Sequence, residues 1–257
     1  MKFVGIDLAW STKNGSGVTV LNGDRSGVDL VSSEVLLSDE DIIAYIHKNV
    51  GNEPAWISID APLIVPNKQG RRLAEDVVGK LFRKYNAGAH PANRTRLSSW
   101  TGTIRGEELT ALLEREGFEH DPYPKKYEKS RKLFEVYPHP SIVVLFNLDK
   151  ILRYKAKPKR DYEFRWAEFR KYQKHLSELP GLSLPAEITK KDVSLLKGKA
   201  LKNYEDKLDS ILCAYISYYA WTNPEKCAVL GNMKRGYILT PIFEHMREEL
   251  KTFESQL

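Results

Sequence analysis

The sequence is poor in the residues that build disulfide frameworks and zinc sites. It contains two cysteines in 257 residues, Cys213 and Cys227. Neither has a partner at the spacing of a metal or redox motif, and the six histidines show no zinc spacing. Cys213 lies in an apolar helical segment, which is typical of an inert buried thiol. We therefore expect a reducing, cytoplasmic compartment.

Long apolar runs, internal repeats and low-complexity tracts are also lacking. No run approaches the ~20 apolar residues of a membrane helix, so we expect no membrane partner. The chain is 42% hydrophobic and 29% charged, as in globular proteins. Its length suits one domain, 1–257, and its net charge of +6 permits a nucleic-acid or phosphate partner without requiring one.

The first 60 residues predict four strands and one helix. Ser38 is a typical helix N-cap, because acidic residues follow it in the first turn. The expected order is Lys2–Trp10, Val18–Leu21, Val28–Leu37, the helix Asp41–Lys48 and the strand Trp56–Asp60. The first three strands favour an antiparallel meander within the mixed sheet of an α/β fold.

Residues from about 65 to 130 have few strand signals and are interpreted as an insertion after the fourth strand. This segment predicts two helices, Arg71–Tyr85 and Glu107–Glu116, joined by a loop over Ala87–Arg105. The remaining chain returns to mixed elements. They are a strand at Leu133–Tyr137, a helix opened by Pro138, helices at Tyr162–Leu179, Tyr204–Trp221 and Phe243–Phe253, and a hairpin at Val229–Thr240.

Acidic residues recur where these elements should be most hydrophobic. Asp7 and Asp60 end the first and fourth strands, Glu135 lies in the strand LFEVY, and Asp206 and Asp209 share one helix face. A single Asp before a proline-containing turn is ordinary turn chemistry. Several converging carboxylates instead require neutralisation, which Mg²⁺ or Mn²⁺ provides through oxygen ligands. Two such ions hydrolyse phosphodiesters in known enzymes.

The stretches VGIDLAW, SIDAPL, FEVYPHP and DKLDSILCAY together resemble the family catalogued as domain of unknown function 429, whose members are predicted nucleases of the ribonuclease H-like fold. The resemblance runs from Gly5 to Tyr215. It implies a ribonuclease H-like mixed sheet flanked by helices. It also implies a metal-dependent nuclease whose catalytic acids are Asp7, Asp60, Glu135 and Asp209.

Within this set we expect Asp7, Asp60 and Asp209 to hold the metal. The face of Asp209 continues into the apolar side of its helix, whereas Asp206 lies one turn earlier and should support the site with His139. The ribonuclease H pattern takes an acid from the helix after the third strand. Here that helix carries its acids at its N-terminus, where they compensate the helix dipole, so Glu135 would have to substitute.

A nucleic-acid partner is predicted from the basic residues that follow Asp60. The insertion leaves the fourth strand within ~10 residues of this acid, and arginine suits bidentate phosphate contact. A solvated charged face, or a lid over a small-molecule pocket, is the alternative. The residues predicted to contact nucleic acid are Arg71, Arg72, Arg94, Arg96 and Arg105.

Two other functions compete with a nuclease. An ATP-binding protein of the actin, heat-shock chaperone or sugar-kinase type shares the core, but Ala9-Trp10 replaces its small phosphate-loop residues and Pro62 lacks a backbone donor. A non-catalytic nucleic-acid binder would retain the basic residues and tolerate amides in place of the acids.

Overall fold

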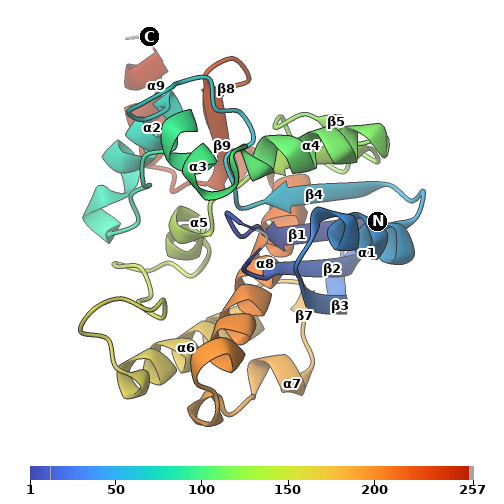
Figure 1. Ribbon diagram of the computed structural model, residues 1–257, viewed down its shortest axis with the longest axis vertical. Helices are drawn as coiled ribbons and strands as arrows, with labels where there is room; N and C mark the ends of the chain where they lie inside the picture. Colours follow the sequence, from blue (N-terminus) through green and yellow to red (C-terminus); the bar gives the residue numbers. More distant parts are fainter. Residues whose placement is uncertain (12, 255–257) are drawn as a thin grey trace.

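The computed structural model describes residues 1–11 and 13–254, and its centre is a seven-stranded mixed sheet with helices on both faces (Figure 1). The strand order is β5-β6-β4-β1-β2-β3-β7. The strands are β1 (Lys2–Asp7), β2 (Ser16–Asp24), β3 (Gly27–Leu36), β4 (Ala55–Ile59), β5 (Glu119–His120), β6 (Arg131–Glu135) and β7 (Leu182–Ser183). The hairpin β8 (Cys227–Asn232) and β9 (Gly236–Pro241) forms a second sheet.

The sheet confirms the predicted mixed α/β class and is consistent with a ribonuclease H-like fold. Strands β1, β2 and β3 form the expected antiparallel meander, and β1 pairs in parallel with β4, which pairs in parallel with β6. The carboxyl ends of β1, β4 and β6 therefore meet at one edge of the sheet, where ligand sites of α/β proteins commonly lie.

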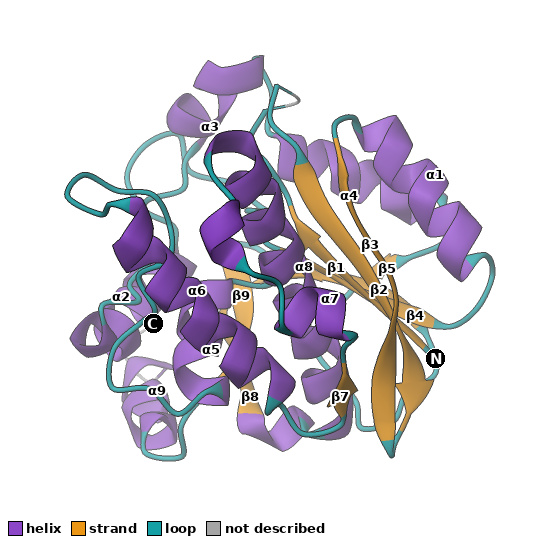
Figure 2. Ribbon diagram, turned by 90° about the horizontal axis from the view of Figure 1, so that it is seen from below, coloured by secondary structure: helices purple, strands orange, loops and turns teal. Residues whose placement is uncertain are grey.

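Helices cover the two faces unequally. The helices α1 (Asp39–Val50) and α4 (Arg105–Arg115) pack on one face, and the long α8 (Gly198–Thr222) packs on the other (Figure 2). In the described ranges, no helix has the length and apolar character to cross a membrane. The other helices of four or more residues are α2 (Leu73–Phe82), α3 (Arg94–Thr101), α5 (Pro138–Leu145), α6 (Tyr162–Ser177), α7 (Ala186–Thr189) and α9 (Met246–Glu254).

The predicted loop over 87–105 is wrong in part, because it contains α3. The side chain of Asn93 caps this helix by accepting from the Arg96 N–H, and Gly102 ends it in the left-handed conformation. Helix α8 also begins at Gly198, six residues before the predicted start. Residues 65–130 are not separate from the sheet, since β5 pairs with β6 and Leu109 of α4 lies in the core beneath β1.

Alternation along β1 directs its side chains to two different cores. Val4 and Ile6 are fully buried against α1 and α4, whereas Phe3 packs in the core that contains α8. Gly5 and Asp7 share the face of Phe3 because side chains in a strand alternate. The side chain of the strand-ending acid is therefore directed to the α8 face.

Helix α8 lies unusually close to the sheet at two glycines. A Cβ atom on Gly5 would lie 2.0 Å from the Ser210 carbonyl oxygen, and one on Gly17 would lie 2.0 Å from the Asp206 carbonyl oxygen. Only glycine permits this approach, because the nearby atoms belong to the helix backbone and cannot move aside as the end of a flexible side chain can. The spacing holds the acidic turn of α8 against the end of β1.

We predict that Gly5→Ala destabilises the protein by about 3 kcal/mol or more, the upper end of the range for overpacked cores. Gly79→Ala is the matched control, because a Cβ there meets nothing closer than 3.8 Å. Alanine in a helix should stabilise that site by about 0.5–1 kcal/mol. Urea unfolding measures both, and equal midpoints for the two variants would contradict the close-contact interpretation.

Candidate active site

Four carboxylates from three elements converge at the carboxyl edge of the sheet. Asp7 ends β1, and Asp60 follows β4 directly, with its N–H donating to the Ile6 carbonyl at 2.8 Å. Asp206 and Asp209 come from α8, one turn apart, and both are buried. The structure thus brings together three of the four predicted catalytic acids and the predicted supporting Asp206.

The charges of Asp7 and Asp60 are incompletely compensated. Burial raises the pKa of Asp7 well above its usual range, and the carboxylates of Asp209, Asp60 and Asp206 raise it further while Lys155 opposes them. Burial likewise raises the pKa of Asp60 to about 7, with Lys155 again opposing. At neutral pH the protonated form of Asp7 is therefore favoured and Asp60 is near the midpoint of its titration, unless a cation joins them.

Asp209 is the best-compensated acid of the cluster. Its Oδ1 accepts hydrogen bonds from the hydroxyls of Tyr154 at 2.7 Å and Tyr172 at 3.0 Å, and its Oδ2 lies 3.0 Å from Lys155 Nζ. Burial works against its charge, but Lys155 and Tyr154 outweigh burial and lower the pKa of Asp209. Asp209 is therefore the carboxylate that stays ionised.

Asp206 is a buried member of the cluster that pairs with a lysine on its own helix. Its carboxylate forms an ion pair with Lys202 one turn earlier and a hydrogen bond with Asp7. Burial raises the pKa of Asp206, and Lys202 partly offsets it. Asp7, Asp206 and Lys202 line one open hollow together with Trp10. Asp206 is therefore in direct contact with the proposed ligand Asp7, as a supporting residue should be.

Glu135 lies at the same sheet edge but in a different charge environment. In β6 it is paired with Ile59, so alternation turns it to the face opposite Asp60. Arg72 donates to both its oxygens, at 2.9 and 2.5 Å, and the Leu63 N–H donates at 2.9 Å. Burial raises the pKa of Glu135 to about 6 although Arg72 opposes it. Its carboxylate is engaged by the turn after β4, outside the group around Asp209.

Two arginines that were predicted to contact nucleic acid are buried, so the predicted surface position of these two is wrong. Arg72 is 3% exposed and pairs with Glu75 and Glu135. Arg105 is 5% exposed and binds Asp39 together with the carbonyl oxygen of Ala9 at 2.8 Å. Sequence reasoning took both for surface charges because it could not see the acids and carbonyls that receive them.

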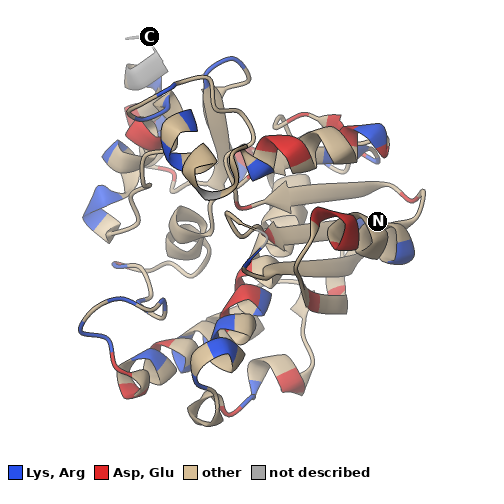
Figure 3. Ribbon diagram, in the orientation of Figure 1, with Lys and Arg blue, Asp and Glu red and all other residues tan. Residues whose placement is uncertain are grey.

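The other three predicted arginines are exposed. Arg94 forms a bidentate pair with Glu107, at 3.1 and 3.0 Å, whereas Arg71 and Arg96 have only carbonyl partners among their hydrogen bonds in the described chain. Arg96 also lies over the Trp10 ring, 5.3 Å from its centroid. Lys and Arg gather again along the loop between α5 and α6 (Figure 3).

His139 lies at the start of α5, in the electrostatic reach of the cluster. Its Nδ1 is 2.9 Å from the Tyr137 hydroxyl. Burial, together with the charge of Lys155, lowers the pKa of His139 to about 3. The ring is therefore neutral at physiological pH, which suits a hydrogen-bonding role beside the acids better than a charged one.

Sequence reasoning missed the cations and hydroxyls that hold the acids. Tyr154 and Lys155 come from a loop 55 and 54 residues before Asp209, and no local pattern links them to it. Burial opposes the charge of Lys155, yet Asp209, Asp7 and Asp60 raise its pKa well above its usual range. Lys202 did carry a signal, since it precedes Asp206 by four residues on one helix.

The donor set suits a hard divalent cation, but it is not closed around one. Within residues 1–11 and 13–254, no three or more His, Cys, Asp or Glu side chains form a group that could hold a metal ion as they stand. Lys155 and Lys202 instead lie against Asp209 and Asp206. Beyond its ion pair with Lys155, the buried Asp209 Oδ2 has no hydrogen-bond partner in the described part of the chain.

The fold and this cluster define a mixed α/β protein with a carboxylate site at the sheet edge. The chain matches the family described as Protein of unknown function (DUF429) over residues 5–234 and belongs to that family. This confirms the family inferred from the four sequence stretches. A comparison with curated proteins gives no match.

We predict that the metal-free protein loses stability as the pH rises from about 4 to about 8. The folded pKa of Asp60, about 7, exceeds its unfolded value of 3.8, so its stabilising protonation is complete below pH 4 and is lost through pH 7. Asp60→Asn should reduce this loss by at least about 1.4 kcal/mol, the free energy of a tenfold change in proton affinity.

Urea unfolding in a chelator, at intervals across this pH range, measures the effect. Asp76→Asn on the exposed side of α2 is the control and should follow the unmodified protein. Parallel profiles for the unmodified protein and Asp60→Asn would show that Asp60 is an ordinary, ionised turn residue.

Proposed function

We propose that the chain binds Mg²⁺ or Mn²⁺ at the carboxylate cluster and hydrolyses phosphodiester bonds in nucleic acid. The observation that carries the proposal is the convergence of Asp7, Asp60 and Asp209 from β1, β4 and α8, with the charges of Asp7 and Asp60 incompletely compensated. Oxygen donors on separate rigid elements are what a divalent cation of this class needs.

Asp7, Asp60 and Asp209 would hold the ion, with Asp206 beside them as a supporting acid. A bound divalent cation supplies an activated water and neutralises charge on the phosphate. The chain itself contributes Lys155 and Lys202, two cations next to the acids, which attract and orient a phosphate. Glu135 would contribute to catalysis through Asp60, because its negative charge raises the pKa of that neighbouring acid.

Nucleic acid is the proposed partner because exposed cations surround the approach to the acids. Arg71, Arg96 and Lys157 all act electrostatically on His90, an exposed residue in the wall of the pocket beside Asp60. Closely spaced exposed cations bind a phosphate backbone through counterion release. A cytoplasmic location belongs to the same proposal and rests on the free thiols of Cys213 and Cys227.

We predict that saturating Mn²⁺ raises the unfolding midpoint of the protein by about 5–10 °C. This follows from about 2.7 kcal/mol of stabilisation at a hundredfold excess over Kd and about 2–4 °C per kcal/mol at this chain length. Asp60→Asn should abolish the shift together with Mn²⁺-dependent cleavage of single-stranded DNA or RNA, and Asp76→Asn should keep both.

The same assay separates the alternatives. Binding of oligonucleotides without cleavage, unchanged in Asp60→Asn, would identify a non-catalytic binder. A midpoint raised by Mg²⁺ with ATP but not by Mn²⁺ alone would favour the ATP-binding alternative. Cleavage of a small phosphoester without any oligonucleotide cleavage would replace the substrate class and keep the metal site.

Lys155 generates a separate prediction, because it occupies the side of Asp209 that a cation would approach. Lys155→Met should lower the stability of the metal-free protein, because it leaves the buried Asp209 without its ion-pair partner. Breaking a fully buried ion pair costs about 3–5 kcal/mol, and we expect a smaller loss here because Lys155 is partly exposed. It should also tighten Mn²⁺ binding, because no ammonium then competes for Asp209. Calorimetric titration and urea unfolding measure the two effects.

Lys157→Met, two residues along the same loop, is the matched control and should change neither quantity. Weaker Mn²⁺ binding in Lys155→Met would show that the lysine assists the metal site and does not compete with it.

A further inference from the structure

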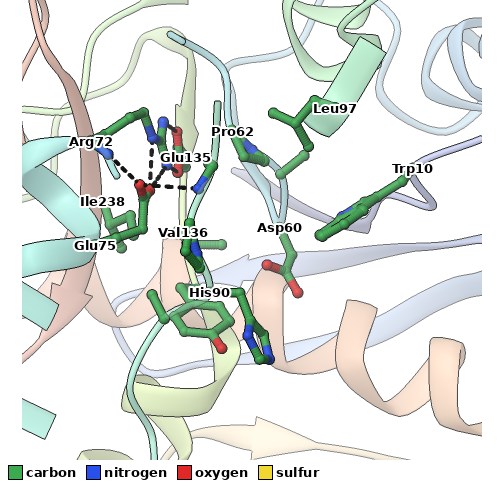
Figure 4. A pocket seen from close by; sticks show the side chains of 15 residues that line it. Trp10, Asp60, Pro62, Arg72, Glu75, His90, Leu97, Glu135, Val136 and Ile238 are labelled. Carbon is green, nitrogen blue, oxygen red and sulfur yellow. Dashed lines mark hydrogen bonds and ion pairs between the residues drawn. The ribbon is translucent and has the colours of Figure 1, made fainter. Parts of the chain in front are cut away.

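A pocket opens beside Asp60, and Asp206 is not part of its lining. Its volume is about 520 Å³ with its open mouth included. Its walls are mainly apolar and aromatic and include Trp10, Pro62, Leu97 and Tyr137. Figure 4 shows Asp60 in the wall of this pocket, between Trp10 and Val136. An apolar space of this kind next to a charged site suits an occupant that has both an apolar part and a charged part.

We propose that this pocket binds the flat ring of a nucleobase, so that the adjoining phosphate of a single-stranded nucleic acid lies at the carboxylate cluster. The proposal deepens the function inferred above and rests on it for the role of the phosphate. It commits to one occupant because ring and phosphate are the apolar and anionic parts of a single nucleotide.

Trp10 is the side chain that links the two regions. It is 38% exposed, it follows Asp7 by three residues, and it lines both this pocket and the hollow formed by Asp7, Asp206 and Lys202. Arg96 lies over its ring at 5.3 Å from the centroid. Aromatic side chains next to arginine form stacking platforms for bases, and one stacked base improves affinity by about 5- to 150-fold.

Three of the charged groups in the pocket wall, Arg72, Glu75 and Glu135, are already paired with one another. The Arg72 Nε–H donates to Glu75 Oε1, and the terminal N–H groups of Arg72 donate to Glu135 and to the Ile64 carbonyl. Figure 4 shows the contacts with the two glutamates. This ion-pair group leaves no guanidinium donor aimed at a base edge. The ring would therefore be held by stacking and shape, with little preference among the four bases.

Cations at the mouth complete the match to a nucleotide. Arg71 donates to the Ala89 carbonyl at 3.3 Å and Arg96 donates to the Pro91 carbonyl at 3.3 Å, and both Ala89 and Pro91 line the pocket. The two arginines suit the phosphates on either side of an inserted base. A base inside a duplex cannot reach such a pocket without leaving its stack, so single strands are the expected ligands.

Binding of two oligonucleotides of equal length and charge tests the pocket. One is a twelve-residue oligothymidylate and the other has the same backbone with abasic tetrahydrofuran units. Binding is measured by fluorescence anisotropy in a buffer with EDTA, because the chelator prevents metal-dependent cleavage. The unmodified protein should bind oligothymidylate about 10-fold more tightly than the abasic strand, within the range for base stacking.

Trp10→Ala should bring the two affinities together, and Trp10→Phe should keep most of the difference. Tyr123→Ala removes another exposed aromatic ring, 51% exposed, and is the matched control that should retain the preference. The unfolding midpoint of Trp10→Ala should equal that of the unmodified protein, which excludes a folding defect as the cause.

Equal affinity of the unmodified protein for both strands, or no affinity for either, overturns the pocket assignment whatever the hydrolysis assay gives. A base preference that Trp10→Ala abolishes, in a protein that cleaves nothing in Mn²⁺, overturns the hydrolytic function and leaves the nucleobase pocket standing. The two proposals therefore fail by different results.

Discussion

The close contact of α8 with β1 and β2 is the constraint on which the site depends. Gly5 and Gly17 let the helix backbone approach, and Thr19 and Ser210 join the two layers through hydroxyl oxygens 2.7 Å apart. The Ser58 hydroxyl also donates to the Cys213 carbonyl at 2.6 Å. Turning the helix by one residue would rotate its side chains by about 100°. These contacts therefore fix which face of α8, and so which acids, meets Asp7.

The sheet edge handles its acids in two different ways. On one face, Glu135 is enclosed by Arg72 and a backbone N–H, with every oxygen occupied. On the other face, the single positive charge of Lys155 acts on Asp7, Asp60 and Asp209 together, and the pKa values of Asp7 and Asp60 stay raised. Glu135, whose two oxygens are both engaged, holds Arg72 and the turn after β4 in place. A partly compensated group retains the capacity to bind a cation or a proton.

The strand-end acids could be predicted from the sequence because a carboxylate that ends a buried strand is visible in a single stretch. The face of Asp209 was also visible, from the apolar residues three and four positions on. The pairing of Arg72 and Arg105 was not, because a buried arginine and a surface arginine have the same local sequence and differ only in distant partners. Lys155 was hidden for the same reason, since its partners lie on three other elements.

Arg72 and Arg105 connect these observations, because each holds one of the turns that carry the site. Arg105 binds the Ala9 carbonyl and the Ser16 hydroxyl, and so fixes the turn between Asp7 and β2 on which Trp10 stands. Arg72 holds Glu135, which in turn accepts the N–H of Leu63 in the turn after Asp60. Side chains in loops are positioned only as well as their backbones are anchored. The two buried arginines therefore act on the acids through the backbone: they keep Asp7, Asp60 and Trp10 in place relative to one another while the exposed Arg71 and Arg96 remain available to a ligand.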